Sequence, residues 1–91
     1  MKTDLRNIPG VGQTIEQDLI NIGINSVNDL CGADPEELYI KDALFKGQKS
    51  DRCLLYVFRL AVYFAENDIH DEEKLKWWYW KDKEYKPEKS V

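Results

Sequence analysis

One apolar stretch in the second half of the chain constrains the fold more than any other feature. After the capping signal Ser50-Asp51, apolar side chains recur at the spacing that gathers them into a wide stripe along one helix. The stripe consists of Leu54, Leu55, Phe58, Ala61, Val62 and Ala65. Because a chain of 91 residues has room for a single core, we expect this long helix to be its central element.

Start and stop signals divide the rest of the sequence into further helices. Gly23 provides a left-handed stop after one amphipathic segment, and Asp34-Pro35 is a strong helix start. The other expected helices are a short one around Leu5 and Ile8, residues 13–22, residues 35–44, and a last helix that opens at Asp71. No segment alternates with period two, so we predict an all-α, compact five-helix bundle.

Length and composition indicate one folded domain. Hydrophobic residues make up 43% of the chain and charged residues 33%, a balance typical of globular proteins. No linker-like segment interrupts the sequence, so we assign residues 1–82 to a single domain and residues 83–91 to a charged tail. No apolar segment reaches the length of a membrane span and no leader segment is recognisable, so we expect no membrane partner and a cytoplasmic location.

The segment Ile8-Pro9-Gly10-Val11-Gly12, here called the Gly10 turn, carries the clearest chemistry. Its glycines allow a sharp bend and a close approach of the backbone to a ligand. The helix that follows directs unpaired amides and a partial positive charge to the same place, where a phosphate can bind without any reading of base sequence. The alternative is a compact connection between packed helices.

The surroundings of this turn resemble the helix-hairpin-helix motif of DNA repair and recombination proteins. The resemblance rests on residues 5–12, on Leu19 and on residues 23–30. It implies that one nucleic-acid strand contacts the backbone amides of the segment Gly10, Val11, Gly12, Gln13, Thr14 and Ile15. It also implies that the carbonyl groups of Arg6, Ile8 and Val11 hold a monovalent cation against the phosphate.

Four residues depart from that motif. Many members of the superfamily carry Lys or Arg where this chain has Gln13 and Thr14, and a small residue where it has Glu16. Asp18 adds a second carboxylate close by. These departures leave the Gly10 turn only backbone dipoles with which to hold a phosphate, and they favour the alternative of a plain connection.

The remainder of the chain resembles the small bacterial "pathogenicity locus" family of helix-hairpin-helix proteins. Residues 34–39, 51–63 and 74–82 carry this resemblance, which spans about residues 4–82. It implies a tandem helix-hairpin-helix fold, similar to the SAM-domain architecture, with a degenerate second hairpin at residues 46–50. The resemblance implies a fold more than a biochemical role.

Charge is distributed unevenly along the chain. The formal net charge of −4 argues against a surface that binds polyanions everywhere. Residues 41–59 nevertheless carry an excess of three positive charges. We expect Lys46, Lys49, Arg52 and Arg59 to form a basic row that follows a phosphate backbone, with ion pairing to Asp or Glu as the alternative.

Several other residues invite a functional reading that we do not favour. We expect Trp77, Trp78 and Trp80 to pack the last helix against the core, with at least one ring exposed. His70 suits a capping or solvent role, and Cys31 and Cys53 lack metal-ligand or disulfide spacing, so both thiols are expected to be reduced and buried. We therefore predict no enzyme, no cofactor and no firm metal site.

Two functions remain at this stage. The first is a nucleic-acid-binding module, weak and sequence-independent, whose partner is DNA or RNA. The second is a protein–protein interaction adaptor of SAM-like fold that uses the Trp-rich C-terminal helix. A solvent-facing patch of Trp77 or Trp80 with Tyr85, together with Gly10 and Gly12 covered by Glu16, would favour the adaptor.

Overall fold

The computed structural model describes residues 3–83, and in them the chain forms three α-helices, four short 3₁₀ helices and no strand. The α-helices are α1 (Gln13–Asn21), α2 (Pro35–Lys46) and α3 (Arg52–Glu66). The 3₁₀ helices are η1 (Asp4–Asn7), η2 (Val27–Leu30), η3 (Glu72–Leu75) and η4 (Trp77–Lys81). The all-α class is confirmed, but the first and last of the five expected helices are 3₁₀ helices.

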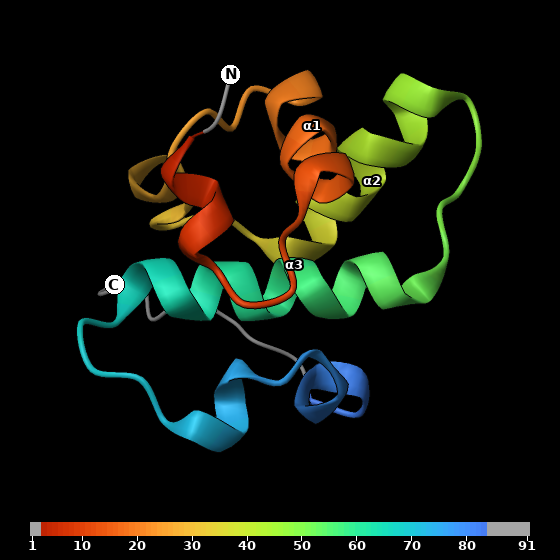
Figure 1. The fold of residues 1–91 in the computed structure, drawn as a ribbon. Helices are drawn as coiled ribbons and strands as arrows, with labels where there is room; N and C mark the ends of the chain where they lie inside the picture. Colours follow the sequence, from red (N-terminus) through yellow and green to blue (C-terminus); the bar gives the residue numbers. More distant parts are fainter. Residues whose placement is uncertain (1–2, 84–91) are drawn as a thin grey trace, which may run out of the picture.

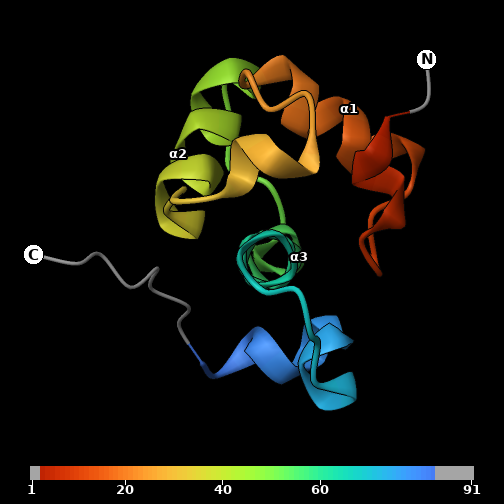
Figure 2. The same ribbon diagram turned by 90° about the vertical axis from the view of Figure 1, so that its left-hand side faces the viewer.

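The helix α3 is the central element, and the other elements pack on two sides of it. In Figure 1, α1, α2 and η1 lie on one side of α3, while η3 and η4 lie on the other. Figure 2 looks along α3 and shows the same two layers. Residues 54–63 are consequently all buried, although the sequence pattern predicted burial of only one stripe. None of the helices within residues 3–83 is long and apolar enough to span a membrane.

The helix ends follow the signals in the sequence. The Asp34 carboxylate accepts a hydrogen bond from the Glu36 amide at 3.0 Å, and the Asp51 carboxylate accepts one from the Cys53 amide at 3.0 Å. The helix α2 continues to Lys46 and stops at Gly47, which has a φ of 77°. It is thus two residues longer than expected, because the left-handed glycine rather than Leu44 ends it.

The segment after α3 forms two 3₁₀ helices instead of one α-helix. Lys76 adopts an extended conformation between them, with a ψ of 126°, and bulky aromatic side chains follow it. Long-range contacts then hold Trp80: its indole N–H donates to the Lys74 carbonyl at 2.9 Å, and its own carbonyl accepts from Arg59 Nη1 at 2.7 Å. Tertiary contacts therefore outweigh the helical signal at Asp71.

Candidate functional site: the Gly10 turn and its groove

The Gly10 turn is fixed from below by the core. Ile8 is buried, and its carbonyl accepts a hydrogen bond from the Val11 amide at 3.1 Å. Gly10 has a φ of 88°, a region that side-chain-bearing residues rarely adopt. A Cβ atom on Gly10 would lie 3.9 Å from the methyl groups of Val57 on α3. The turn therefore rests on α3 and holds the start of α1 in a defined position.

The N-terminus of α1 is open. Its N-cap residue is Gly12, which has no side chain to cap the helix, and the first bonded amide is that of Glu16, which donates to the Gly12 carbonyl at 2.9 Å. Within residues 3–83, no acceptor is bound to the amides of Gly12, Gln13, Thr14 or Ile15. Residues 12–14 are exposed, so these donors and the positive end of the helix dipole face solvent.

Glu16 does not cover this opening. Its carboxylate accepts hydrogen bonds from the backbone N–H of Thr3 at 2.7 Å, from the Thr3 hydroxyl at 2.8 Å and from Arg6 Nε at 2.9 Å. These bonds, led by the one from the Thr3 backbone, lower the pKa of Glu16 to about 2. Arg6 compensates the charge of Glu16, and the hydrogen bonds of the carboxylate hold η1 against α1. The acidic residue that departs from the motif therefore has a structural role within the fold.

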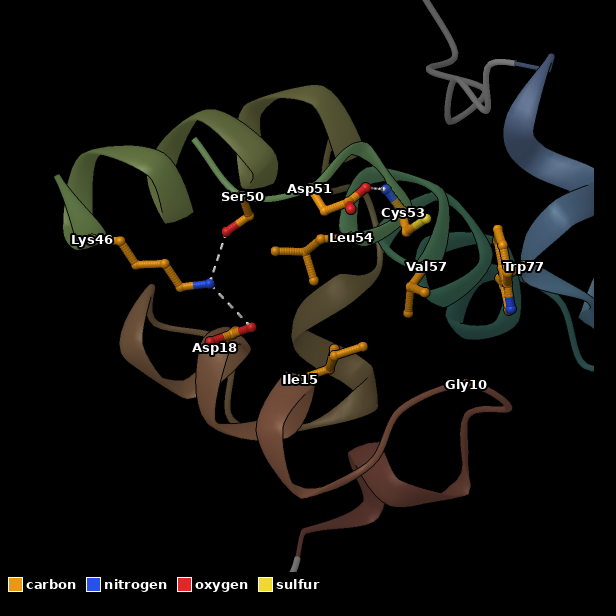
Figure 3. A pocket seen from close by; sticks show the side chains of 10 residues that line it. All are labelled: Gly10, Ile15, Asp18, Lys46, Ser50, Asp51, Cys53, Leu54, Val57 and Trp77. Carbon is orange, nitrogen blue, oxygen red and sulfur yellow. Dashed lines mark hydrogen bonds and ion pairs between the residues drawn. The ribbon is translucent and has the colours of Figure 1, made fainter. Parts of the chain in front are cut away.

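Asp18 is also paired within the fold, with a lysine that it shares with Asp42. Lys46 Nζ lies 3.3 Å from its carboxylate and 3.1 Å from that of Asp42, and it donates to the Ser50 hydroxyl at 2.9 Å. Figure 3 shows Lys46 reaching from the end of α2 towards α1. Burial alone would lower the pKa of Lys46, but the hydrogen bonds to the two carboxylates outweigh it and raise the pKa. Lys46 therefore joins α2 to α1.

The expected basic row does not form on one surface. Arg59 is only 5% exposed, because η4 covers this side of α3, and its guanidinium binds Glu36 at 2.7 Å and the Trp80 carbonyl. Arg52 is exposed, and its Nε donates to the Tyr56 hydroxyl at 3.5 Å. Lys49 lies beside the outer face of α2. The alternative of ion pairing holds for Lys46 and Arg59, and Arg59 is corrected from a surface residue to a buried one.

A groove of about 520 Å³ runs between the Gly10 turn, α3 and η4. One part of its wall is apolar and includes Gly10, Ile15, Leu54, Val57 and Trp77, whereas the part towards the end of α2 is polar and includes Asp18, Lys46, Ser50 and Asp51; Figure 3 draws both. The Trp77 ring stacks on Tyr56, with 6.5 Å between ring centres and 2° between planes. Sequence reasoning did not place Trp77 beside the Gly10 turn, since only the chain reversal after α3 brings these distant residues together.

The three tryptophans have different environments. Trp80 is buried, whereas Trp77 and Trp78 are exposed. The expectation that the three rings seal the last helix against the core is right for Trp80 and wrong for Trp77 and Trp78, and the expectation that at least one ring stays exposed is confirmed. Tyr85, which we grouped with them, lies outside the described residues.

His70 and the two cysteines show no arrangement typical of a catalytic or metal site in the described part of the chain. His70 Nε2 donates to the Phe64 carbonyl at 2.9 Å and its ring stacks on Phe64. Cys31 and Cys53 are exposed rather than buried, because each stands at an element end. Desolvation and the neighbouring Asp51 raise the pKa of the Cys53 thiol. In the described part of the chain, no three His, Cys, Asp or Glu side chains form a metal cluster.

The cation site implied by the resemblance would use the carbonyls of Arg6, Ile8 and Val11. The Ile8 carbonyl already accepts the Val11 amide, which leaves one lone pair for a cation. The cation site stays a prediction that rests on the resemblance.

Comparison with known proteins identifies the family. The family model described as Pathogenicity locus (Cdd1) matches residues 1–86, which is nearly the whole chain. No curated protein and no solved structure shows significant similarity to the sequence. The chain therefore belongs to the pathogenicity locus family.

Proposed function

We propose that this protein binds nucleic acid weakly and without sequence preference, through a phosphate held at the Gly10 turn. The observation that carries the proposal is the set of four exposed or half-buried amides, from Gly12 to Ile15, that have no acceptor within residues 3–83. The proposal includes the finer fold assignment, in which η1, the Gly10 turn and α1 form a helix-hairpin-helix unit within a SAM-like arrangement.

The carboxylates near the turn are compatible with this proposal. Glu16 is bound to Thr3 and Arg6, and Asp18 is bound to Lys46. Arg6 compensates the charge of Glu16, and Lys46, which is shared with Asp42, compensates part of the charge of Asp18, so the repulsion of a phosphate is reduced. Gly10 and Gly12 are exposed, so the covering of the turn by Glu16 that would favour an adaptor is absent.

The groove gives the proposed ligand a second contact. A strand with a phosphate at the start of α1 would place a neighbouring sugar or base against the apolar wall that ends at Trp77. Aromatic rings stack on any base, so this contact adds affinity without sequence preference. A single strand or a frayed duplex end can present such a base, and an intact duplex cannot.

Affinity should be low. The overall charge is −4, and Lys46 and Arg59 are engaged in internal ion pairs. Few phosphates can then be neutralised, so we expect a dissociation constant of about 10⁻⁴ M, at the weak end of non-specific binding, and a shallow dependence on salt. Phosphate contacts by Lys49 and Arg52 remain predictions for a longer strand.

An amide titration tests the proposal residue by residue. Heteronuclear NMR spectra recorded at low salt with a short single-stranded oligodeoxynucleotide should show the largest shifts at Gly12–Ile15, with smaller shifts in the Trp77 indole. Unshifted amides at these four positions, with oligonucleotide in large excess, would refute the proposal.

A charge variant separates binding from folding. Gln13→Glu places a carboxylate at the positive end of α1, which favours the helix but repels a phosphate, so binding should weaken about tenfold while stability is kept. Asn28→Asp adds the same charge on η2 and is the matched control. Equal effects of both variants would show that only overall charge matters.

The adaptor remains a second candidate because Trp78 is exposed. Burial of Trp80 and the stacking of Trp77 on Tyr56 reduce the aromatic surface that such an adaptor could present. If the titration fails, protection of Trp78 from solvent quenchers by a protein partner is the observation that would support this function.

A further inference from the structure

The helix α2 is apolar on two opposite sides. Leu38 faces the core and is buried, as the spacing of the helix requires. Ile40 and Leu44, one turn apart, point the other way and are 56% and 78% exposed, whereas Phe45, which is 61% exposed, lies seven residues after Leu38 and so on the core-facing side near the helix end. Large apolar side chains gathered on one exposed helix face are unusual in a small monomer and typically mark an interface.

Charges of opposite sign stand at the two ends of this face. Glu37 lies in the first turn of α2, one turn before Ile40 and Lys41, whereas Lys49 follows the end of the helix. Lys49 lines a groove of about 410 Å³ together with Ile40 and Leu44. In the described chain, neither Glu37 nor Lys49 belongs to an ion pair.

We propose that this face of α2 binds the same face of a second copy of the chain, as an antiparallel pair related by a two-fold axis. A two-fold interface brings each residue of one copy against its counterpart in reverse order. With the axis near residues 42–43, Glu37 of each copy lies opposite Lys49 of the other, and Ile40 of each copy meets Leu44 of the other near the centre. Reversal of the helix direction also aligns the two dipoles favourably.

The charge pattern is what selects a second copy as the occupant. An acid at one end and a base at the other make the face complementary to itself only when the two helices run in opposite directions. A parallel pair would place like charges together, which is unfavourable. The apolar centre supplies the area, and the end charges supply the orientation.

The position of α2 leaves the Gly10 turn uncovered in such a dimer. Figure 2 shows α2 at one edge of its layer and η1 with the Gly10 turn at the opposite edge. The dimer would therefore carry two phosphate sites that face away from each other. Its formation does not depend on nucleic-acid binding, and Lys49 would pair with Glu37 of the second copy instead of a phosphate.

Sedimentation equilibrium of the full chain, without nucleic acid, tests the inference over low micromolar to millimolar concentrations. We expect a reversible monomer–dimer equilibrium that Leu44→Glu abolishes, since each new carboxylate would be buried against Ile40 of the other copy. Near-ultraviolet circular dichroism of Leu44→Glu controls for folding. A wild-type chain that stays monomeric throughout this range overturns the proposal.

Charge reversal tests the orientation. Glu37→Lys and Lys49→Glu should each weaken dimerisation about tenfold, and the double variant should return to within about threefold of the wild type, because the pair is restored in reversed order. Lys83→Glu makes the same charge change outside this face and should have no effect. If the effects of the two single variants simply add in the double variant, the antiparallel pairing is wrong.

Discussion

Two glycine turns precede α1 and α3, and the helix that follows is capped by a side chain after only one of them. The Gly10 turn and the Gly47 turn (residues 46–51) each contain a glycine with positive φ, 88° and 77°, and each leads into an α-helix. The helix after the Gly10 turn begins at a glycine with no capping side chain. The N-cap residue of the helix after the Gly47 turn is Asp51, whose carboxylate accepts a hydrogen bond from the backbone amide of Cys53.

This difference assigns separate tasks to the two turns. At the Gly47 turn, the dipole of α3 is already met by a carboxylate, and Lys46 is drawn into a cluster with Asp18, Asp42 and Ser50. At the Gly10 turn the corresponding donors face solvent. Of the two glycine turns, the first therefore leaves the start of its helix open, and the second holds α2 against α1.

The largest effect that separates the turns is expected at Lys46. Lys46→Met keeps the length of the side chain but leaves the carboxylates of Asp18 and Asp42, which are both buried, without a cation. An unpaired buried charge is costly, and since the ammonium is partly exposed we expect a loss of about 2–3 kcal/mol in unfolding free energy. Urea denaturation measures it.

The control for this variant is on the same helix. Lys41→Met makes the same change at an exposed position with no ion pair in the described chain, and it should alter stability by less than about 0.5 kcal/mol. Equal losses for the two variants would mean that the cluster at the Gly47 turn does not lock α2 to α1.

The next largest effect on stability is expected from substitution of the glycines with positive φ in the two turns. Gly10→Ala and Gly47→Ala each force a side chain into the left-handed region, at a cost of about 1–2 kcal/mol measured by urea denaturation. Only Gly10→Ala should also alter the amide shifts caused by an oligonucleotide, because the strain of its positive φ falls in the turn that leads into the proposed site. A loss of those shifts in Gly47→Ala would show that the second turn takes part in binding.

The features of this fold that depend only on residues adjacent in sequence could be predicted. The caps at Asp34 and Asp51 and the stop at Gly47 lie in the residues that form them, so the sequence indicates where α2 and α3 begin and where α2 ends. The identity of the central helix follows from its apolar stripe. The type of the last helix could not be predicted, because contacts of Trp80 with Arg59 and Lys74 decide it.

In the candidate site, too, features set by the local sequence could be predicted, and features set by tertiary packing could not. The open amides follow from the placement of two glycines before a helix. The burial of Arg59 does not follow from its position seven residues after Arg52, because it needs Glu36 on another helix and the layer formed by η4. The proximity of Trp77 to Gly10 also depends on packing across α3, to which no local signal points.

A smaller effect on stability is expected if the start of α1 is given a capping carboxylate like that of α3. Gly12 has a φ of −101° and empty space at its Cβ position, so Gly12→Asp can be accommodated. Its carboxylate should cap α1 and raise the unfolding free energy by a few tenths of a kcal/mol, about 0.3, while it removes oligonucleotide binding. Thermal denaturation and the NMR titration measure the two effects.

Gly12→Asn separates capping from charge in this experiment. The amide side chain occupies the same helix donors without a negative charge, so binding should fall less than in Gly12→Asp. Binding that survives unchanged in both variants would exclude the start of α1 as the anion site and would make the two turns equivalent.

The smallest effect near neutral pH concerns Glu16, which secures the open turn to η1. Its pKa is lowered from 4.5 in the unfolded chain to about 2 by the bonds from Thr3 and Arg6. A lowered pKa in the folded state means that the stabilisation is complete above about pH 4.5 and is lost as the pH falls from there towards 2. Glu16→Gln should flatten the decline of stability in this window, measured by urea denaturation at each pH, whereas Glu72→Gln, at an exposed position, should leave it unchanged. Parallel profiles for wild type and Glu16→Gln would mean that the carboxylate is not held by Thr3 and Arg6, and the argument that Glu16 is turned away from the helix start would fall with it.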